Sequence, residues 1–372
     1  MCLRVGEVAG YMEELAPLHL AMDWDNVGLL VGRTDAEVTN VLVALNYNDA
    51  VLKEALRQQA NFIICHHPFL YKPIKSIRTD TPPGALLRET LINDLHVYAS
   101  HTNLDMAEEG VSWALGKAFS LKNMQILHKT GEDPLLKLVV FVPSSHLDAV
   151  RDALALAGAG WIGSYSHCSF ASPGTGTFMP REGTHPYSGQ IGNLEKVQEV
   201  RLETILHASI KERALSAMIK AHPYEEVAFD LYPLALPGKF SGLGRLGELP
   251  KEITLKGLVK LIKKTLQVEN LTVVGEDTML IKKMAVCGGS GGDLIGEASR
   301  LGADVLLTGD IKHHQGEEAH ALGIAVVDAG HAATEKVIIE PLASRLQEKV
   351  AAKGHKNKVI SSQIDPSYWK LM

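Results

Sequence analysis

Two adjacent histidines, His66 and His67, directly follow a short apolar run that is typical of a buried strand. Asp105 closes a polar segment after a second such run, and His331 and Glu335, four residues apart, follow a third. Imidazole and carboxylate groups bind zinc and iron, and a carboxylate can bridge two cations. Neighbouring side chains leaving a strand point in different directions, so the histidine pair suits one ligand on each of two ions. These residue types therefore predict a two-metal site at strand ends.

Each part of this set also has a simpler interpretation. A histidine pair occurs by chance in exposed loops or in a core, and Asp105 would equally serve as the N-cap of a helix that starts near Glu108. His331 and Glu335 would also form an ordinary surface pair one helical turn apart. Three such clusters at three strand ends, in one chain, favour the metal site over the separate interpretations.

Further polar residues lie close to the expected strand ends and could support such a site. They would fix the tautomers of the imidazole ligands or transfer protons, and the alternative is a structural role. We expect His101 and His314 to be the proton-transfer groups. The complete set is His101, Asp310, His313, His314 and Asp328.

The first and last thirds of the chain repeat one plan of elements that would position these residues. Each third shows a strand, a helix, a strand ending in a polar cluster, a second helix, and a strand ending in another polar cluster. The expected strands are 41–45, 62–65 and 97–99 in the first third, and 284–287, 305–307 and 324–327 in the last. Alternating strands and helices predict parallel strands with right-handed crossovers.

The middle of the chain has a different pattern of expected strands and helices. Expected strands at 138–142, 202–205 and 227–231 alternate with helices at 145–157 and 210–221, around a Gly/Ser/Thr/Pro-rich stretch at 160–192. This order predicts a compact α+β insert of ferredoxin-like type. We therefore expect an α/β protein in which two similar α/β halves, residues 1–128 and 244–372, form one core domain interrupted by an insert, residues 129–243.

Composition restricts the class of protein. The formal net charge of −6 and the ordinary charged fraction of 22% make a general nucleic-acid binder an unlikely expectation. The four cysteines are far apart and are expected to be reduced thiols of a cytoplasmic protein. The first ten residues do not have the pattern of a secretory signal, and there is no apolar run of 18 or more residues, so we expect no membrane association.

Five phrases of the sequence resemble one known family. They are Trp24–Leu29 (WDNVGL), Cys65–Pro68 (CHHP), Ser100–Asp105 (SHTNLD), Thr308–His314 (TGDIKHH) and Asp328–Glu335 (DAGHAATE). In this order they resemble the Nif-three-like family, whose members are often named GTP cyclohydrolase I type 2 homologues. The resemblance extends over nearly the whole chain. The middle segment resembles the PII/CutA-like domain of longer bacterial members, in Gly174–Phe178 (GTGTF) and Ala221–Glu226 (AHPYEE).

The resemblance implies a toroidal homohexamer with two divalent metal ions per subunit facing an internal cavity. Zinc and iron are the expected ions, with manganese as a third option. By motif, the implied ligands are His66, His67, Asp105, His331 and Glu335, with Glu335 bridging the two ions. The implied activity is that of a metal-dependent hydrolase on a nucleotide.

Three functions fit these features. In the first, the metal pair activates water for attack on C8 of the guanine of GTP, and the ring opens with loss of formate. The second is a two-metal phosphoesterase, and the third is a metal-binding or regulatory assembly with little turnover. The segment Gly288–Gly292 would either cradle an anion such as triphosphate or form a tight turn that needs positive φ. Likewise, His222–Glu226 in the insert would be either a small-molecule or metal sensor, or an ordered turn.

Overall fold

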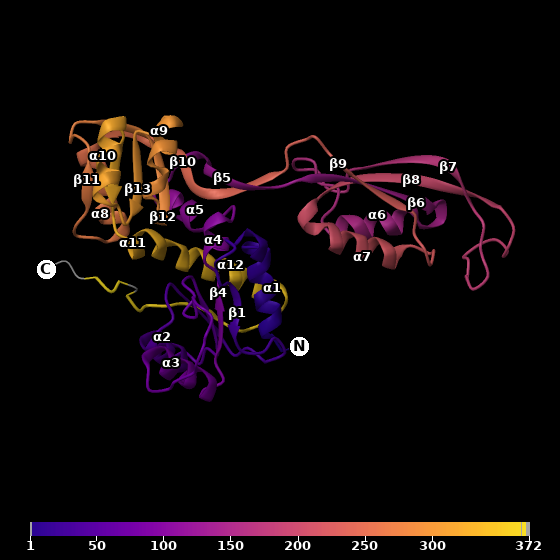
Figure 1. Cartoon of the computed structure of the whole chain (residues 1–372), viewed down its shortest axis with the longest axis horizontal. Helices are drawn as coiled ribbons and strands as arrows, with labels where there is room; N and C mark the ends of the chain where they lie inside the picture. Colours follow the sequence, from indigo (N-terminus) through magenta and orange to yellow (C-terminus); the bar gives the residue numbers. More distant parts are fainter. Residues whose placement is uncertain (1, 366, 370–372) are drawn as a thin grey trace. The chain divides into compact units, whose positions relative to one another are not determined.

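The computed structural model describes residues 2–365 and 367–369 of the chain, which divides into two compact units (Figure 1). The core unit combines residues 1–130 and 241–372, and the insert unit comprises residues 131–240. The insert expected from the sequence, residues 129–243, starts two residues before this unit and ends three residues after it. In the described part of the chain, no helix combines the length and the apolar character needed to cross a membrane.

The first sheet of the core unit has the strand order β1-β4-β3-β2-β15. Strands β2, β3, β4 and β15 run parallel, and β1 pairs with β4 in the antiparallel direction. The strands are β1 (Gly28–Val31), β2 (Val41–Ala44), β3 (Phe62–Cys65), β4 (His96–Ala99) and β15 (Val359–Ser361). The helices of the first part of the chain are α1 (Val5–Leu15), α2 (Asp49–Arg57), α3 (Pro82–Ile92), α4 (Thr102–Met106) and α5 (Val111–Ala118).

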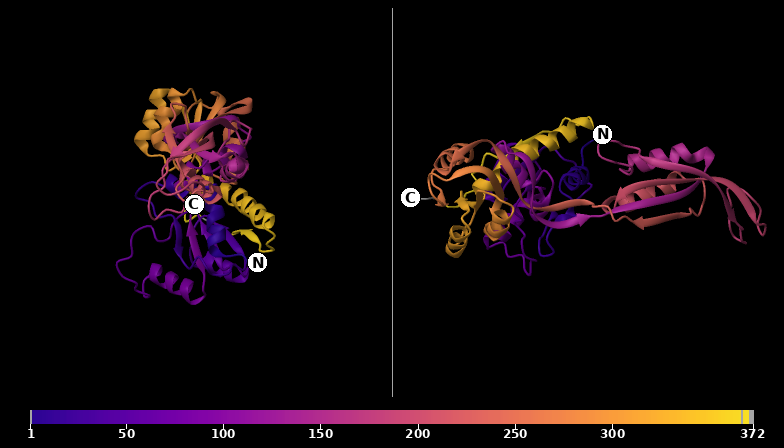
Figure 2. Two further views of the ribbon diagram at one scale, coloured as in Figure 1. Left: turned by 90° about the vertical axis from the view of Figure 1, so that its right-hand side faces the viewer. Right: turned by 90° about the horizontal axis from the view of Figure 1, so that it is seen from above.

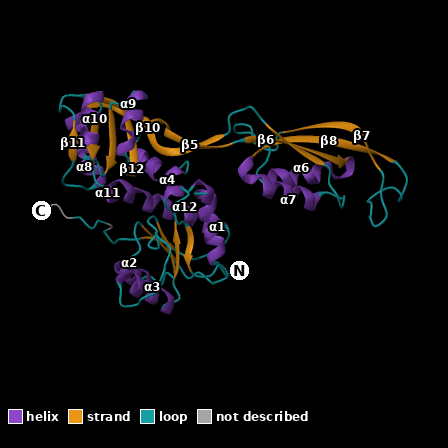
Figure 3. Ribbon diagram, in the orientation of Figure 1, coloured by secondary structure: helices purple, strands orange, loops and turns teal. Residues whose placement is uncertain are grey.

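Helices cover both faces of this sheet, which explains why its central strands are apolar at every position. Side chains alternate between the faces of a strand. Phe62 and Ile64 of β3 pack with α1 and α12 (Ile339–Ala352), whereas Ile63 and Cys65 pack with α2 and α3 (Figures 1 and 3). Each such side chain stabilises the fold by about 1.5–3 kcal/mol when buried. The sheet therefore holds its strand ends in fixed positions.

The second sheet of the core unit has the order β11-β14-β13-β12-β10-β5. Strands β12, β13 and β14 are parallel, and β11 pairs with β14 in the antiparallel direction, as β1 does with β4. The strands are β5 (Lys122–Asp133), β10 (Lys239–Thr254), β11 (Thr272–Val274), β12 (Leu280–Ser290), β13 (Val305–Gly309) and β14 (Ala325–Asp328). The remaining helices are α8 (Leu255–Leu266), α9 (Ile295–Arg300), α10 (His313–Leu322) and α11 (His331–Glu335).

The insert unit has the element order β6-α6-β7-β8-α7-β9 and one antiparallel sheet of order β7-β8-β6-β9. Figures 1 and 2 show its two helices side by side along one face of that sheet. The elements are β6 (Leu135–Pro143), α6 (Leu147–Leu156), β7 (Ser169–Phe178), β8 (Glu195–His207), α7 (Lys211–Ala221) and β9 (Phe229–Pro233). Buried side chains of both helices, such as Val150 and Met218, form a separate apolar core with β6 and β8.

The structure decides between the alternatives for Asp105 and shows where the segment at 288–292 lies. Asp105 lies inside α4 and does not cap a helix near Glu108, because the next helix starts at Val111. The segment 288–292 begins within the end of β12, which continues to Ser290, and Gly289 there has a positive φ of 67°.

Candidate metal centre

Five side chains predicted as metal ligands come from three strand ends of the core unit. His66 and His67 follow β3, and their backbone N–H groups still donate to the carbonyls of Ala44 and Leu45. Asp105 lies in α4, just after β4. After β14, Gly330 with φ of 84° leads into α11. The strand ladder thus fixes the backbone of His66 and His67, and the short helices α4 and α11, which follow β4 and β14, carry the other three side chains.

The carboxylate of Glu335 lies at the centre of the cluster. Its Oε1 is 3.1 Å from Nε2 of His331 and 3.6 Å from Nε2 of His66, and its Oε2 is 3.1 Å from Nε2 of His67. Nε2 of His66 is also 3.7 Å from Oδ1 of Asp105. His331 and Glu335 reach the same point because residues four apart share one helix face. All five predicted residues are therefore brought together.

The outer nitrogen of each imidazole is held by a hydrogen bond. Nδ1 of His66 lies 2.8 Å from the carbonyl oxygen of Ser100, and Nδ1 of His331 lies 2.6 Å from a carboxylate oxygen of Asp310. Nδ1 of His67 lies 2.7 Å from Oδ1 of Asn46. These oxygens accept, so each Nδ1 carries the proton and donates. In neutral imidazoles the three inward Nε2 atoms then have free lone pairs, which is the arrangement of metal-binding histidines.

Buried polar atoms without partners mark the same point. Nε2 of His66, Oδ1 of Asp105 and Oε2 of Glu335 are buried and accept or donate no hydrogen bond. Buried polar atoms are normally satisfied, and buried charges are normally paired or coordinate metals. Cations placed among these atoms would satisfy all three. Among the residues that the structure describes, two groups of side chains have the spacing to hold a metal ion: His66 with His67 and His101, and His67 with His331 and Glu335. The donor set therefore fits a metal site.

The pKa values of the carboxylates and imidazoles in the cluster depend strongly on one another. Burial by itself would raise the pKa of Glu335, but the surrounding imidazoles hold that pKa well below its usual value. Burial would lower the pKa of His66, but Asp105 and Glu335 raise it to about 9. Asp105 is buried beside the carboxylate of Glu335, and its pKa rises to about 6 although His66 opposes the shift. The two carboxylates thus attract positive charge, whether protons or metal ions.

The glycine-rich end of β12 makes room for the ligands. Gly289 has φ of 67°, which favours glycine, and a Cβ there would lie 2.4 Å from Oε1 of Glu335. Its N–H donates to Oγ1 of Thr334. The segment Gly288–Gly292 was expected either to cradle an anion or to form a tight turn with positive φ. The structure shows the positive φ at Gly289, and this glycine packs closely against Glu335.

His101 stands beside the ligands with a partner of its own. One of its ring nitrogens lies within 4.8 Å of ligand atoms of His66 and His67, and Nδ1 is 2.9 Å from Oδ1 of Asp25. The other oxygen of Asp25 accepts from the backbone and hydroxyl of Thr102. Burial would raise the pKa of Asp25, but these hydrogen bonds lower it, so Asp25 is an anion that orients the ring of His101.

The other polar residues named from the sequence, two histidines and two aspartates, lie outside the cluster of five. His313 and His314 are exposed at the start of α10, and neither belongs to the two groups of side chains above. Asp328 accepts hydrogen bonds from the backbone of Ile311 and Gly330 and so shapes the loop before α11. Asp310 holds His331, as expected of a supporting residue.

Sequence reasoning assigned no role to Asn46 or Asp25, although both support a histidine of the cluster. Asn46 begins the polar turn that leads into α2, and a turn residue gives no sign of a partner 21 positions away. Asp25 stands in the phrase Trp24–Leu29, so the family resemblance was the only signal that pointed to it.

Comparison with known proteins identifies close relatives. Proteins named "GTP cyclohydrolase 1 type 2 homolog" from Halalkalibacterium halodurans and Bacillus subtilis are 43% and 42% identical to the chain. These matches cover 95% and 96% of the chain, and 94% and 96% of the relatives. A crystal structure described as a Bacillus cereus protein related to NIF3 matches with a TM-score of 0.92, 42% identity and full coverage of both chains.

A second solved structure, of a Staphylococcus aureus protein, matches with a TM-score of 0.77 at 30% identity, over 100% of the chain and 99% of that protein. The family described as Duf34/NIF3 (NGG1p interacting factor 3) matches residues 3–367. Both the sequence and the fold thus agree over the whole length, and the chain belongs to the Duf34/NIF3 family.

Proposed function

We propose that this protein is a dinuclear-metal hydrolase that acts on a nucleotide, with ring opening of GTP as the specific reaction. The observation that carries the proposal is the convergence of three Nε2 atoms and two carboxylates, with the three Nδ1 atoms held from outside. The names of the relatives, homologues of GTP cyclohydrolase, support the substrate class.

The distances suggest how the five side chains would divide between two ions. His66 lies next to Asp105, and His67 lies next to His331, with their ring centroids 5.4 Å apart. One oxygen of Glu335 approaches His66 and His331, and the other approaches His67. We therefore assign His66 and Asp105 to one ion and His67 and His331 to the other, with Glu335 shared. Zinc, iron and manganese all accept this donor set.

When bound, such an ion pair would lower the pKa of water and polarise the bond under attack. The protein would supply the proton transfers through His101. Asp25 fixes its Nδ1–H, and burial and nearby His66 lower the pKa of His101, so the ring is neutral near pH 7 and its Nε2 accepts a proton. Trp24 packs at the edge of this ring, with centroids 6.1 Å apart, and limits its rotation.

The test is turnover by protein loaded separately with zinc, iron(II) or manganese. Incubation with GTP is expected to release formate and to give a product that becomes a fluorescent pterin on oxidation. His67→Ala is expected to lose metal and activity together. His101→Gln is expected to keep its metal and to lose about 10²- to 10⁴-fold in kcat, the usual contribution of a positioned acid or base.

His313→Ala is the matched control, because His313 is a histidine of the same unit that is almost fully exposed. It should retain full activity and metal content. Release of phosphate from phosphate esters, without formate from GTP, would replace this function with a phosphoesterase. Metal-loaded protein that turns over neither substrate would contradict an enzymatic role and support a metal-binding assembly.

We further propose, from the resemblance, a toroidal homohexamer located in the cytoplasm. Light scattering should then give six times the chain mass of 40.4 kDa, about 242 kDa. A monomer or dimer at micromolar concentration would contradict the hexamer. We also propose that the insert is a ferredoxin-like domain of the PII/CutA kind. Its βαββαβ element order supports this assignment.

A further inference from the structure

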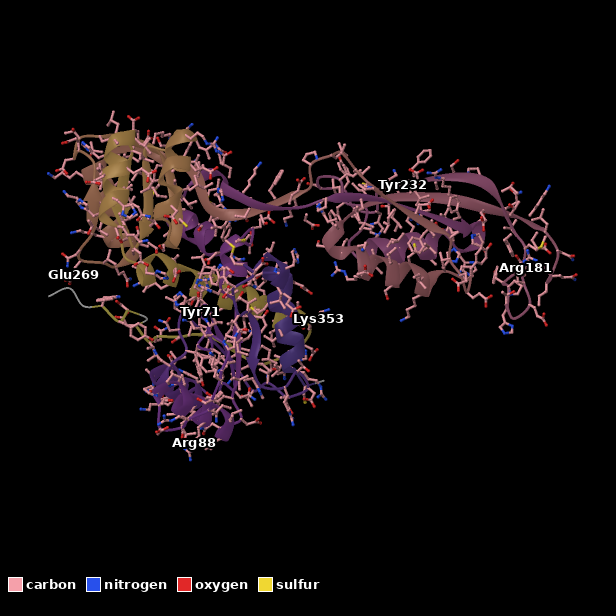
Figure 4. The ribbon with its side chains drawn as sticks, viewed as in Figure 1. Tyr71, Arg88, Arg181, Tyr232, Glu269 and Lys353 are labelled. Carbon is pink, nitrogen blue, oxygen red and sulfur yellow. The ribbon has the colours of Figure 1, made fainter. Side chains whose placement is uncertain are left out.

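The insert unit contains a cavity of about 620 Å³, far larger than a buried water site and within the range of small-molecule pockets. Its wall is formed by β7, the start of β8, the connection between them, and the turn after α7. Figure 4 labels Arg181 in that connection. Apolar atoms form most of the exposed wall, which suits the body of an organic ligand.

Three aromatic rings stand around one part of this cavity. Tyr224 lies at the centre, with its ring centroid 6.3 Å from that of Phe178 and 5.9 Å from that of Tyr187. The rings are tilted by 53° and 44°, so they form walls at an angle and do not stack flat. All three rings line the cavity, and the face of an aromatic ring attracts a cation that lies against it.

The turn that presents Tyr224 is rigid. Nδ1 of the buried His222 accepts a hydrogen bond from the backbone N–H of Tyr224, and Nε2 donates to the carbonyl of Phe141. Both nitrogens of His222 are thus engaged, which leaves none for a metal ion. Of the two interpretations of His222–Glu226, these hydrogen bonds support the ordered turn. His222 stabilises the turn and thereby fixes the position of Tyr224.

The charge around the cavity is negative. Three carboxylates line it, those of Glu199, Glu225 and Glu226, against one guanidinium, that of Arg201. Nε of Arg201 is 2.9 Å from a carboxylate oxygen of Glu203, whose other oxygen is 2.8 Å from Nζ of Lys137, so the three carboxylates of the lining still outnumber its single guanidinium. The backbone N–H of His185 donates to Glu225 and ties the β7–β8 connection to the wall.

An organic cation fits this lining better than a metal ion or a phosphate. In the described residues, each group of three or more histidine, cysteine or acidic side chains at metal-binding spacing belongs to the core unit. Three carboxylates would repel a polyphosphate. Aromatic faces combined with carboxylates are the features that recognise alkylammonium groups.

We propose that the insert unit binds a small organic cation, an alkylammonium compound with an apolar body, between Phe178, Tyr187 and Tyr224 and beside Glu199. The site is independent of the metal centre and of the hydrolase activity proposed above.

The test measures the binding of choline to the full-length protein by ligand-observed NMR titration. Its neutral isostere, 3,3-dimethylbutan-1-ol, has the same shape without the charge and is expected to bind at least tenfold more weakly. ATP is the anionic comparison and should not compete with choline. Tyr224→Ala is expected to weaken choline binding about 5- to 30-fold, the range of a desolvated cation–π contact.

Tyr232→Ala is the matched control, since Tyr232 is an exposed tyrosine of the same unit on β9 and does not line the cavity (Figure 4). Tyr224→Phe keeps the ring and should restore most of the affinity. Glu199→Gln removes only charge and should weaken binding even if the alanine variant unfolds. Equal affinity for choline and its neutral isostere, no binding of choline, or displacement of choline by ATP would each overturn the proposal.

Discussion

Substitution of Glu335 by glutamine tests the shared-ligand arrangement. The change keeps the shape of the side chain and removes one negative charge from a residue that is 3% exposed. Both carboxylate oxygens of Glu335 lie 3.1–3.6 Å from the Nε2 atoms of three histidines. Breaking a buried charge pair by removing one partner costs about 3–5 kcal/mol, which corresponds to between about 10²- and 10⁴-fold in affinity.

In the proposed arrangement one carboxylate serves both ions, so Glu335→Gln should weaken both sites. After loading and gel filtration, elemental analysis should find two ions per chain in the unchanged protein and close to none in this variant. Asp105→Asn should lose only the ion held by His66. Titration against a chelating dye would give the change in affinity, and circular dichroism would show that each variant is folded.

The chain offers a close control for this experiment. Glu317 also lies four residues after a histidine, with Oε1 3.4 Å from Nε2 of His313, but both side chains are exposed on α10. Glu317→Gln therefore makes the same chemical change in the same kind of pair outside the cluster, and it should keep both ions. Two ions retained at unchanged affinity by folded Glu335→Gln protein would refute the shared-ligand reasoning.

Three further predictions follow from the geometry. Asp310→Asn weakens the hydrogen bond to Nδ1 of His331 and should reduce metal affinity about 10- to 100-fold, the usual effect of losing the hydrogen-bond partner of a metal-binding histidine. An unchanged metal affinity in a chelator titration would contradict this prediction. In chelator-treated protein, burial would lower the pKa of His66, but the buried carboxylates raise it to about 9. The protonated imidazole therefore contributes fully to stability below pH 6.5, and this contribution is lost as the pH rises through 9. The melting temperature of that protein should fall across this interval more than that of metal-loaded protein, and parallel profiles would argue against the assignment. Burial raises the pKa of Cys65 and Cys287 to about 12, so iodoacetamide at pH 8 should leave both unmodified until the protein unfolds, as mass spectrometry can show.

Sequence patterns were sufficient for the parts of the fold that depend on continuous burial. Phe62–Cys65 and residues 305–307 are apolar because both faces of each sheet are covered, and a short apolar run between polar clusters is recognisable without a structure. The cluster of candidate ligands was also recognisable, since a histidine pair and an i,i+4 His–Glu pair at strand ends are uncommon combinations; that these residues bind metal stays a prediction.

Features that depend on distant partners were not accessible in this way. The roles of Asn46 and Asp25 depend on hydrogen bonds to side chains 21 and 76 positions away. The length of β12 depends on its pairing with β13, which resumes at Ser290 after a register shift in the segment that contains Gly289, whose φ is 67°. The position of Asp105 within α4 was missed because a helix of five residues has too little periodicity to detect.

The most direct test of a dinuclear metal centre is anomalous X-ray diffraction from crystals of zinc-loaded protein. We predict two peaks per chain on the two sides of Glu335, separated by roughly 3.5–4 Å as in other two-metal sites. One peak should adjoin His66 and Asp105, and the other should adjoin His67 and His331. A single peak, or peaks away from these residues, would contradict the account.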